Sequence, residues 1–364
     1  MQISDLAKAG CSVWLDDLSR AKLTGTDAHS LPPRIKNSGV VGVTTNPAIF
    51  KAAISDATEY SADIAALNGK SVEEVITKLT TDDVRIACDL FTDIYRSSNG
   101  FDGRVSIEVD PRSAHDTAAT VKEGKSLWQI IDRPNVLIKV PATLAGLPAI
   151  TELIGAGISV NVTLIFSIER YLQVIEAYIA GIELAAKNGM DLNQIHSVAS
   201  FFISRLDTAI DPILKSDGGV LAHSLLGAAA IANAHLAYEK FEQEFATNRW
   251  SDLAQKGAHV QRPLWASTGV KDPAYDDTRY VLELVAPNTV NTMPQSTLDA
   301  VIDHGVFKGN TITDKYDEAR IVFTQLAELG ISIEKVTADL ETDGVKKFAD
   351  AWNELLASVK GAMA

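Results

Sequence analysis

The chain repeats one pattern, in which short apolar runs rich in β-branched residues alternate with longer stretches of helical periodicity. Runs such as VSIEVD, VLIKV and SVNVTLI are too short for helices and too apolar for strands with one exposed face, so they indicate parallel strands covered by helices. Eight runs are expected as strands: 12–16, 39–44, 105–110, 136–140, 159–163, 197–202, 264–267 and 288–291. Eight alternating βα units predict an α/β fold that closes into a (β/α)8 TIM barrel with additional helices.

The length of 364 residues exceeds the roughly 250 residues of a minimal barrel. Helical patterns account for the excess, as insertions at about 51–98 and 208–258 and as a C-terminal extension at about 312–364. The sequence contains no repeat of fixed period and no low-complexity tract. We therefore expect residues 1–364 to form a single TIM-barrel domain with these helices added to it.

Charge and hydropathy exclude several classes of partner. The net charge of −14 argues against a nucleic-acid binder, because recognition of phosphate backbones needs clustered Lys and Arg. The longest apolar stretch, 221–236, is interrupted by His, Ser and Asn, which indicates a buried helix and not a membrane span. MQISDLAKAG contains an acid and no continuous apolar core, so no secretory signal is expected.

Motifs for bound metals and nucleotides are missing from the sequence. Cys11 and Cys88 have no spacing typical of a disulfide framework or a metal site, and no histidine pair has ligand spacing. A Walker loop and a GxGxxG motif are also missing. We expect a cytoplasmic monomer or homodimer that uses no metal and no cofactor and has no nucleic-acid or membrane partner.

Lys139 is the sharpest candidate for chemistry, because functional side chains of TIM barrels lie at the C-terminal ends of the strands. It is the lone cation in the run VLIKVP. An ammonium group in such surroundings is costly unless it is paired or neutralised, and a neutral lysine is a nucleophile toward carbonyls. The alternative is a structural lysine that reaches the barrel rim or pairs with an acid.

Polar side chains on the neighbouring strands are expected beside Lys139. Glu108, one strand earlier, could relay protons through water or simply neutralise the lysine. Asn161 and Thr163 share one face of the fifth strand and would flank Lys139 from its other side. Hydrogen bonding within a polar barrel layer explains these two residues equally well.

Two further strand ends carry acidic and amide groups. Asp16 ends the first strand, where a carboxylate could accept a hydroxyl proton, and Asp17 is expected to cap the helix at 18–23. Strand alternation lets only one of the two aspartates face the barrel axis. Asn46 precedes Pro47 and is expected to cap a helix, although its amide could also bind a sugar hydroxyl.

Phosphate recognition is expected at the ends of the sixth and seventh strands. Ser200 and Arg205 belong to SFFISR, which opens a helix, and Ser267 and Lys271 belong to ASTGVK. Backbone amides, hydroxyls and a cation can converge on one anion in such loops. A surface ion pair for Arg205 and a solvated Lys271 are the alternatives.

Seven blocks of sequence resemble the transaldolase family, particularly its longer bacterial subgroup, over nearly the whole chain. The blocks are WLDDLSR (14–20), GVTTNPAIF (42–50), SIEVDPR (106–112), IKVPAT (138–143), NVTLIFS (161–167), SFFISRLD (200–207) and ASTGVKDP (266–273). They occur in the order found in the family.

The resemblance implies a role for each matched residue. Lys139 corresponds to the Schiff-base lysine, Asp16 to the acid/base, and Glu108 with Thr163 to a proton relay through water. Substrate-binding positions correspond to Asn46, Ser200, Arg205 and Ser267. Shorter members carry an Arg where this chain has Gly269, so we infer that Lys271 supplies the second phosphate cation.

The reaction implied is transfer of a dihydroxyacetone unit between phosphorylated sugars in the non-oxidative pentose phosphate pathway. The donor would be sedoheptulose 7-phosphate or fructose 6-phosphate, and the acceptor glyceraldehyde 3-phosphate or erythrose 4-phosphate. Three alternatives remain from the residues alone. They are an aldolase that releases free dihydroxyacetone, a Mg²⁺-dependent lyase that uses Asp16, Glu108 and Asp110, and a non-catalytic sugar-phosphate binder.

Overall fold

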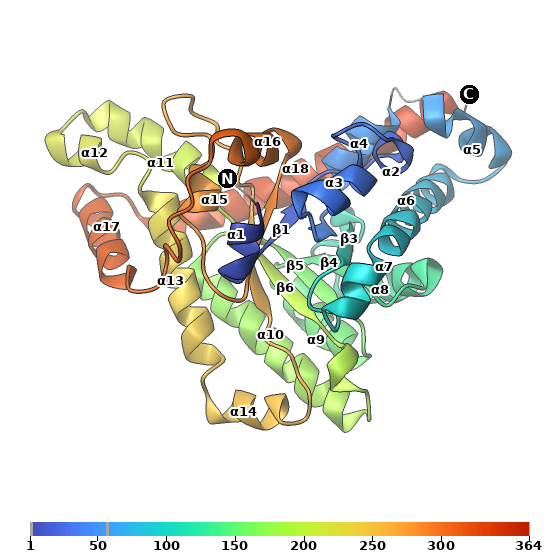
Figure 1. Cartoon of the computed structure of the whole chain (residues 1–364), viewed down its shortest axis with the longest axis horizontal. Helices are drawn as coiled ribbons and strands as arrows, with labels where there is room; N and C mark the ends of the chain where they lie inside the picture. Colours follow the sequence, from blue (N-terminus) through green and yellow to red (C-terminus); the bar gives the residue numbers. More distant parts are fainter. Residues whose placement is uncertain (1–2, 56–57, 364) are drawn as a thin grey trace.

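Eight parallel strands close into a barrel in sequential order in the computed structural model, which describes residues 3–55 and 58–363 (Figure 1). The expected (β/α)8 TIM barrel is confirmed. The strands are β1 (Cys11–Leu15), β2 (Gly42–Val43), β3 (Arg104–Glu108), β4 (Val136–Pro141), β5 (Val160–Ile165), β6 (Ser197–Phe202), β7 (Arg262–Ala266) and β8 (Thr289–Met293).

The strands differ from their predicted bounds by one or more residues at most places, and the second and eighth strands show a physical reason for the difference. The predicted strand 39–44 shrinks to β2 because Gly39 takes a left-handed conformation (φ 66°) and ends helix α3 (Leu31–Ser38). Asn288, predicted to begin the eighth strand, instead turns the chain with φ 58°, so β8 begins one residue later and extends to Met293. In both places a turn in the left-handed region takes precedence over the apolar pattern.

Helices connect and surround the strands. Those up to β5 are α1 (Ile3–Lys8), α2 (Arg20–Thr24), α3, α4 (Pro47–Ile54), η1 (Thr58–Tyr60), α5 (Ser61–Ala66), α6 (Val72–Leu90), α7 (Thr92–Ser97), η2 (Pro111–Ser113), α8 (Thr117–Ile131) and α9 (Gly146–Gly155). Between β5 and β8 lie α10 (Ile168–Lys187), η3 (Leu192–Gln194), α11 (Ser204–Asp217), α12 (Val220–Ser224), α13 (Ala229–Glu244), α14 (Asn248–Ala254) and α15 (Arg279–Leu282).

Three helices follow β8: α16 (Gln295–His304), α17 (Tyr316–Glu328) and α18 (Ile333–Ala362). The last of these contacts α4, α6 and α11, which places it across the end of the barrel where the strands terminate (Figure 1). Helix α14 lies at the opposite end of the barrel. The predicted C-terminal helical region therefore covers one mouth of the barrel.

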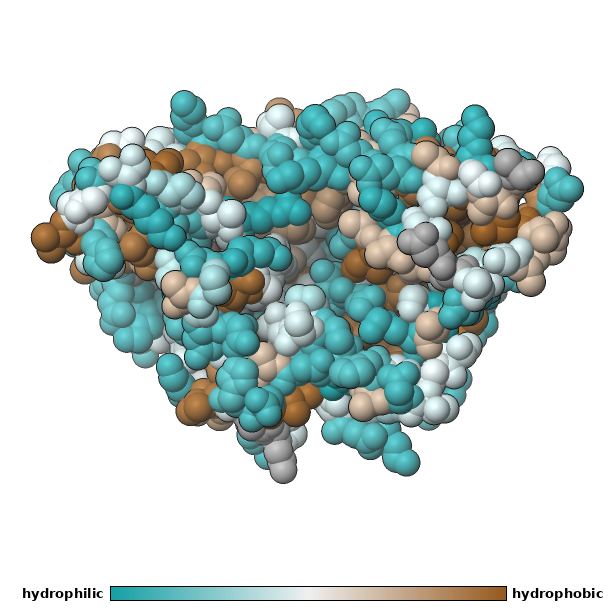
Figure 2. All heavy atoms as spheres, turned by 90° about the horizontal axis from the view of Figure 1, so that it is seen from above, coloured by the Kyte–Doolittle hydropathy of each residue, from teal (hydrophilic) through white to brown (hydrophobic). Residues whose placement is uncertain are grey.

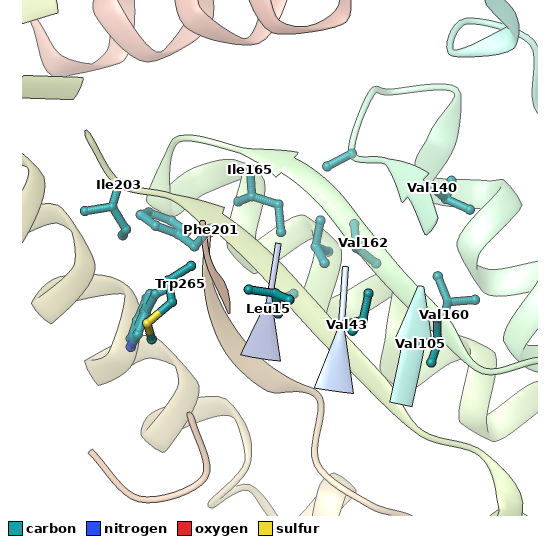
Figure 3. Packing of buried hydrophobic residues seen from close by; sticks show 14 of the residues in the cluster. Leu15, Val43, Val105, Val140, Val160, Val162, Ile165, Phe201, Ile203 and Trp265 are labelled. Atoms are coloured by element: carbon teal, nitrogen blue, oxygen red, sulfur yellow. The ribbon is translucent and has the colours of Figure 1, made fainter. Parts of the chain in front are cut away.

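Side-chain alternation sorts the strands into an outer apolar face and a mixed inner face. Figure 3 shows outward residues such as Val105, Val140, Val160 and Val162, which belong to the large cluster packed beneath the helices. Inner positions hold Trp14 and a smaller apolar cluster in the middle of the barrel, and polar residues toward both ends. This arrangement leaves the two ends of the barrel for polar sites.

Hydrophilic residues cover most of the face seen in Figure 2, and hydrophobic residues form small separate groups on it. Within residues 3–55 and 58–363, none of the helices has the length and apolar character needed to cross a membrane. The stretch 221–236, expected as a buried helix, instead spans the short helix α12, a turn and the first half of the largely buried α13.

Candidate active site

Lys139 lies on β4 with Glu108 of β3 and Asn161 of β5 as its register partners. Its side chain is buried, with Nζ 3.2 Å from Oε2 of Glu108. Nζ also donates a hydrogen bond of 3.0 Å to the carbonyl oxygen of Thr45, which follows β2. The lysine is therefore held between two strands and aimed along the barrel axis toward the mouth.

Glu108 is the acid that neutralises this lysine. Burial raises the pKa of its carboxyl to about 7, while the charge of Lys139 opposes the rise and that of Asp16 adds to it. Within the described part of the chain, neither carboxylate oxygen has a well-aligned hydrogen-bond partner besides this ion pair. Glu108 can therefore gain or lose a proton near neutral pH.

Asp16 directly follows β1 and faces the same cavity as Lys139. The hydroxyl of Thr44 donates a hydrogen bond of 2.6 Å to its Oδ1. Burial raises the pKa of Asp16, and Lys139 and the Thr44 hydrogen bond hold the rise back. The carboxylate is thus oriented by Thr44 and placed to exchange a proton.

Asp17 points away from Lys139 and forms an ion pair of 3.1 Å with Lys22. The prediction that Asp17 caps the following helix is wrong. Helix α2 begins at Arg20, and its cap is Ser19, whose hydroxyl accepts the backbone N–H of Lys22. Asp17 lies too early in the chain to reach those amides.

Asn161 and Ser200 form a polar layer beneath the cavity. Nδ2 of Asn161 donates to Oγ of Ser106 at 3.0 Å, and Oγ of Ser200 donates to Oδ1 of Asn161 at 2.7 Å. Ser200 also lines the cavity, whereas Asn161 does not. The geometry therefore favours the structural alternative for Asn161, as a side chain that orients Ser200.

Thr163 lines the cavity with a buried hydroxyl for which the described residues supply no hydrogen-bond partner. The strand is irregular just beyond it. Its register with β6 shifts between Val162 and Ile165, and Leu164 takes a left-handed conformation with φ 61°. Such a conformation costs a leucine about 1–2 kcal/mol, and strained residues of this kind cluster at functional sites.

The cavity at the C-terminal mouth has a volume of about 190 Å³. Eight of the ten predicted site residues line it: Asp16, Asn46, Lys139, Thr163, Ser200, Arg205, Ser267 and Lys271. A neighbouring hollow of about 450 Å³, lined by Asn46, Asp17, Tyr60 and residues of α4, adjoins it at Asn46. Oδ1 of Asn46 caps α4 through the N–H of Ile49 at 3.0 Å, so the predicted cap is confirmed.

Two cations stand at one side of the cavity. Arg205, in the first turn of α11, stacks over the ring of Phe202 at 5.3 Å, and burial lowers the pKa of its guanidinium. Its buried Nη1 has no partner among the described residues. A Cβ placed on Gly269 would lie 3.9 Å from Nζ of Lys271, so this ammonium occupies the space beside position 269.

Ser267 joins the two loops that carry these cations. Its Oγ lies 3.0 Å from Oγ of Ser204, and its carbonyl accepts the N–H of Ser204. Ser267 also takes a left-handed conformation with φ 56°, at the point where β7 ends. The loops after β6 and β7 therefore converge on one side of the cavity, which suits an anionic group.

The sequence did not point to Phe348, which α18 places over the cavity. Nζ of Lys139 lies 5.4 Å from the centre of its ring, and Phe202 and Phe348 are in edge contact at 6.5 Å. Helix α18 approaches closely here because Gly344, one turn earlier, has no Cβ to collide with Leu164. The Gly344/Phe348 spacing on one helix face was the available signal.

Comparisons with known proteins identify the family of this chain. A family model described as Transaldolase/Fructose-6-phosphate aldolase matches residues 13–359. The chain is 57% identical to a transaldolase of Renibacterium salmoninarum over 99% of this chain and 96% of the relative. It is 57% identical to transaldolase 1 of Streptomyces coelicolor, over 97% of this chain and 93% of that protein. A transaldolase of Mycolicibacterium smegmatis is 54% identical, with 99% and 97% covered. The chain is an enzyme of the transaldolase/fructose-6-phosphate aldolase family.

Proposed function

We propose that this enzyme transfers a dihydroxyacetone unit from a ketose phosphate to an aldose phosphate through a Schiff base on Lys139. The donor is fructose 6-phosphate or sedoheptulose 7-phosphate, and the acceptor is erythrose 4-phosphate or glyceraldehyde 3-phosphate. The observation that carries the proposal is the buried lysine, paired with Glu108, that opens into a cavity with two cations. The reaction belongs to the non-oxidative pentose phosphate pathway, in the cytoplasm.

Imine formation requires Lys139 to lose a proton before it attacks the ketose carbonyl. Glu108 is the nearest carboxylate, and its pKa of about 7 lets it accept that proton near neutral pH. The carbonyl oxygen then leaves as water when the carbinolamine collapses to the iminium ion. The unpartnered hydroxyl of Thr163 is suited to hold the water that carries protons between these groups.

Carbon–carbon cleavage follows from the iminium ion, which draws the electron pair of the breaking bond toward nitrogen. Asp16 accepts the proton of the hydroxyl on the departing carbon of the breaking bond, so that this carbon leaves as the aldehyde of an aldose phosphate. The three-carbon enamine remains on Lys139 until its carbon attacks a second aldose, and Asp16 returns the proton to the new alkoxide. Water then hydrolyses the imine and releases the product.

Arg205 and Lys271 bind the phosphate of the substrate in this proposal. Both line the same side of the cavity, and Arg205 has a buried, unpartnered Nη1. Charge-assisted hydrogen bonds to phosphate are the strongest that a protein supplies without a metal. They also place the carbonyl of an extended sugar phosphate at the other end of the cavity, near Lys139.

Phe348 favours transfer over release of free dihydroxyacetone. An aldolase of the same family would use the same lysine, and water reaching the enamine separates the two outcomes. Phe348 is only 7% exposed, and it covers the lysine together with Phe202. An apolar cover that limits water supports transfer to a bound aldose.

The geometry does not support a Mg²⁺-dependent lyase built from Asp16, Glu108 and Asp110. Both carboxylate oxygens of Asp110 bind the guanidinium of Arg112, and Asp110 does not line the cavity. Within the described residues, no three His, Cys, Asp or Glu side chains come close enough to share a metal ion.

Borohydride trapping tests the proposal directly. The enzyme is incubated with fructose 6-phosphate, reduced with borohydride and examined by intact mass and peptide mapping. The expected result is a reduced three-carbon adduct on the peptide that contains Lys139. Lys139→Arg keeps a cation beside Glu108 but cannot form an imine, so it should show no adduct and no transfer.

An acceptor titration then separates transfer from aldol cleavage. Steady-state release of glyceraldehyde 3-phosphate from fructose 6-phosphate, or of erythrose 4-phosphate from sedoheptulose 7-phosphate, should depend on an added aldose phosphate acceptor. Full activity of Lys139→Arg, or an adduct on another lysine, would refute the Schiff-base assignment. Rapid release of dihydroxyacetone without acceptor would refute transferase activity while leaving the lysine assignment intact.

A further inference from the structure

A second polar site lies at the end of the barrel opposite Lys139. Arg104 begins β3 on the same inward face as Ser106 and Glu108, and Arg262 begins β7 on the inward face of Leu264. Both arginines are buried, with exposed fractions of 1% and 4%. They therefore point into the N-terminal end of the barrel, a region to which the proposed reaction assigns no role.

Arg262 is paired with a carboxylate, although its Nε has no partner among the described residues. Its Nη1 lies 3.2 Å from Oδ1 of Asp102, and its Nη2 donates to Oγ of Ser12 and to the carbonyl of Thr289. The guanidinium also stacks on the ring of Phe101 at 3.6 Å. This arginine has an evident structural role, since it ties β7 to β1 and β8.

Arg104 shares only the aromatic contact, since its guanidinium lies 4.9 Å from the centre of the Tyr95 ring. Its Nε and Nη1 donate to the carbonyls of Gly100 and Pro134, and its third nitrogen, Nη2, is buried without a partner among the described residues. No ion pair involves Arg104 within residues 3–55 and 58–363. Burial lowers the pKa of its guanidinium to about 10, so the group still carries its charge at neutral pH. A buried cation without a counter-ion is costly, which calls for a ligand.

Arg104 is one of the residues that line a cavity of about 250 Å³. Gly100 allows the chain to pack closely against two of these lining residues, because a Cβ there would lie 2.9 Å from Nη2 of Arg104 and 2.8 Å from Nε2 of His196. His196 and His259 stack at 4.2 Å on one wall, and burial lowers the pKa of both imidazoles, so they are neutral. The rest of the wall is largely apolar and includes Trp14, Leu137, Val198 and Trp250.

The two arginines that line the cavity and the carboxylate paired with Arg262 sum to an excess of one cation. Two arginines and one carboxylate, Asp102, give +2 − 1 = +1, with both histidines neutral. Asp102 is already held by Arg262, Ser12 and Trp14. A small anion would complete the set.

We propose that this cavity binds a small phosphate-bearing anion, with its oxygens on Nη2 of Arg104 and its remaining atoms against the apolar wall. Arginine is the side chain best suited to phosphate oxygens, and the cavity is too small for a nucleotide-sized ligand. Its walls come from β1, β3, β4, β6 and β7 and from α14, so a bound anion would tie together strands that lie far apart in the sequence.

Binding is tested in an Arg205→Ala, Lys271→Ala background, which removes the two proposed phosphate-binding cations of the other mouth. Isothermal titration with inorganic phosphate and, in parallel, with glycerol 3-phosphate should each show one site, and both should raise the thermal midpoint. Tighter binding of glycerol 3-phosphate would identify an organic monoester as the ligand, and equal binding would identify free phosphate. No binding of either probe in this background would overturn the proposal.

Two substitutions locate the site. Arg104→Gln should weaken binding roughly 10- to 100-fold, the loss expected for one charged hydrogen bond. Because Arg104 supports the backbone, a surface variant provides an independent check: Ala254→Glu, on exposed α14, adds a competing carboxylate at the rim. Ala254→Glu should weaken binding while Ala254→Gln leaves it unchanged. Equal binding by the background, Arg104→Gln and Ala254→Glu proteins would refute the assignment.

Discussion

Glu108→Gln should change how the stability of the enzyme depends on pH. Burial raises the pKa of Glu108 from 4.5 to about 7 in the folded protein, so the native state holds this proton in a range where the unfolded chain has released it. Between those two pH values the native state binds more protons, and its free energy of unfolding falls as the pH rises. A glutamine at this position cannot titrate and does not contribute to that fall.

The shift of 7 − 4.5 = 2.5 pH units corresponds to about 3 kcal/mol at 1.36 kcal/mol per unit. The variant also loses the ion pair with Lys139, and this loss lowers its free energy of unfolding relative to wild type. The informative quantity is therefore the difference in unfolding free energy between Glu108→Gln and wild type. That difference should move in favour of the variant by about 3 kcal/mol from pH 4.5 to pH 7.5.

Urea unfolding at half-unit pH steps, followed by the fluorescence of the five tryptophans, measures this difference. Glu152→Gln removes an exposed carboxylate and should run parallel to wild type. Lys139→Met removes the charge that holds the pKa of Glu108 down, so its loss of stability should extend above pH 7. Parallel curves for Glu108→Gln and wild type would show that Glu108 has no raised pKa, and the proton-relay argument would fail with it.

Three further substitutions test the mouth of the barrel. Phe348→Ala should lower the free energy of unfolding by about 3–5 kcal/mol. It should also increase acceptor-independent release of dihydroxyacetone, because water gains access to Lys139. An unchanged ratio of release to transfer would contradict the role of Phe348 as a cover. Lys271→Ala should raise KM for phosphorylated donors roughly 10- to 100-fold in steady-state kinetics. Adding Gly269→Arg to this variant should restore part of the lost affinity, because the two side chains share one space. Asn46→Ala should lower the unfolding free energy by about 1 kcal/mol through loss of the helix cap. Asn46→Ser keeps the cap and should change only KM. Equal kinetics for Asn46→Ser and wild type would limit the role of this residue to capping.

The barrel and the position of Lys139 could be predicted from the sequence because both depend on local patterns. Strand alternation assigns Glu108, Lys139 and Asn161 to inner faces of three successive strands, and parallel pairing brings them into register. The cap at Asn46 followed from its position before Pro47. These inferences needed only the spacing of residues within one element and the order of the elements.

Other features depended on contacts that local patterns do not contain. Asp16, and not Asp17, lines the cavity, where it accepts a hydrogen bond from Thr44, just after the neighbouring strand β2. The hydrogen bonds of Asn161 go to Ser106 and Ser200, which occupy its amide from both sides. Each case required side chains from separate strands to be placed within hydrogen-bond distance of one another.

The sequence by itself determined the strand count, the inner and outer faces and the lysine at the mouth, because apolar periodicity and β-branching act within a few residues. Only the tertiary structure decided that Phe348 covers Lys139 and that Arg104 and Arg262 share the opposite end. Those contacts depend on where α18 crosses the mouth and on how the barrel closes. Both are set by packing over the whole chain, in which many individually weak contacts act together.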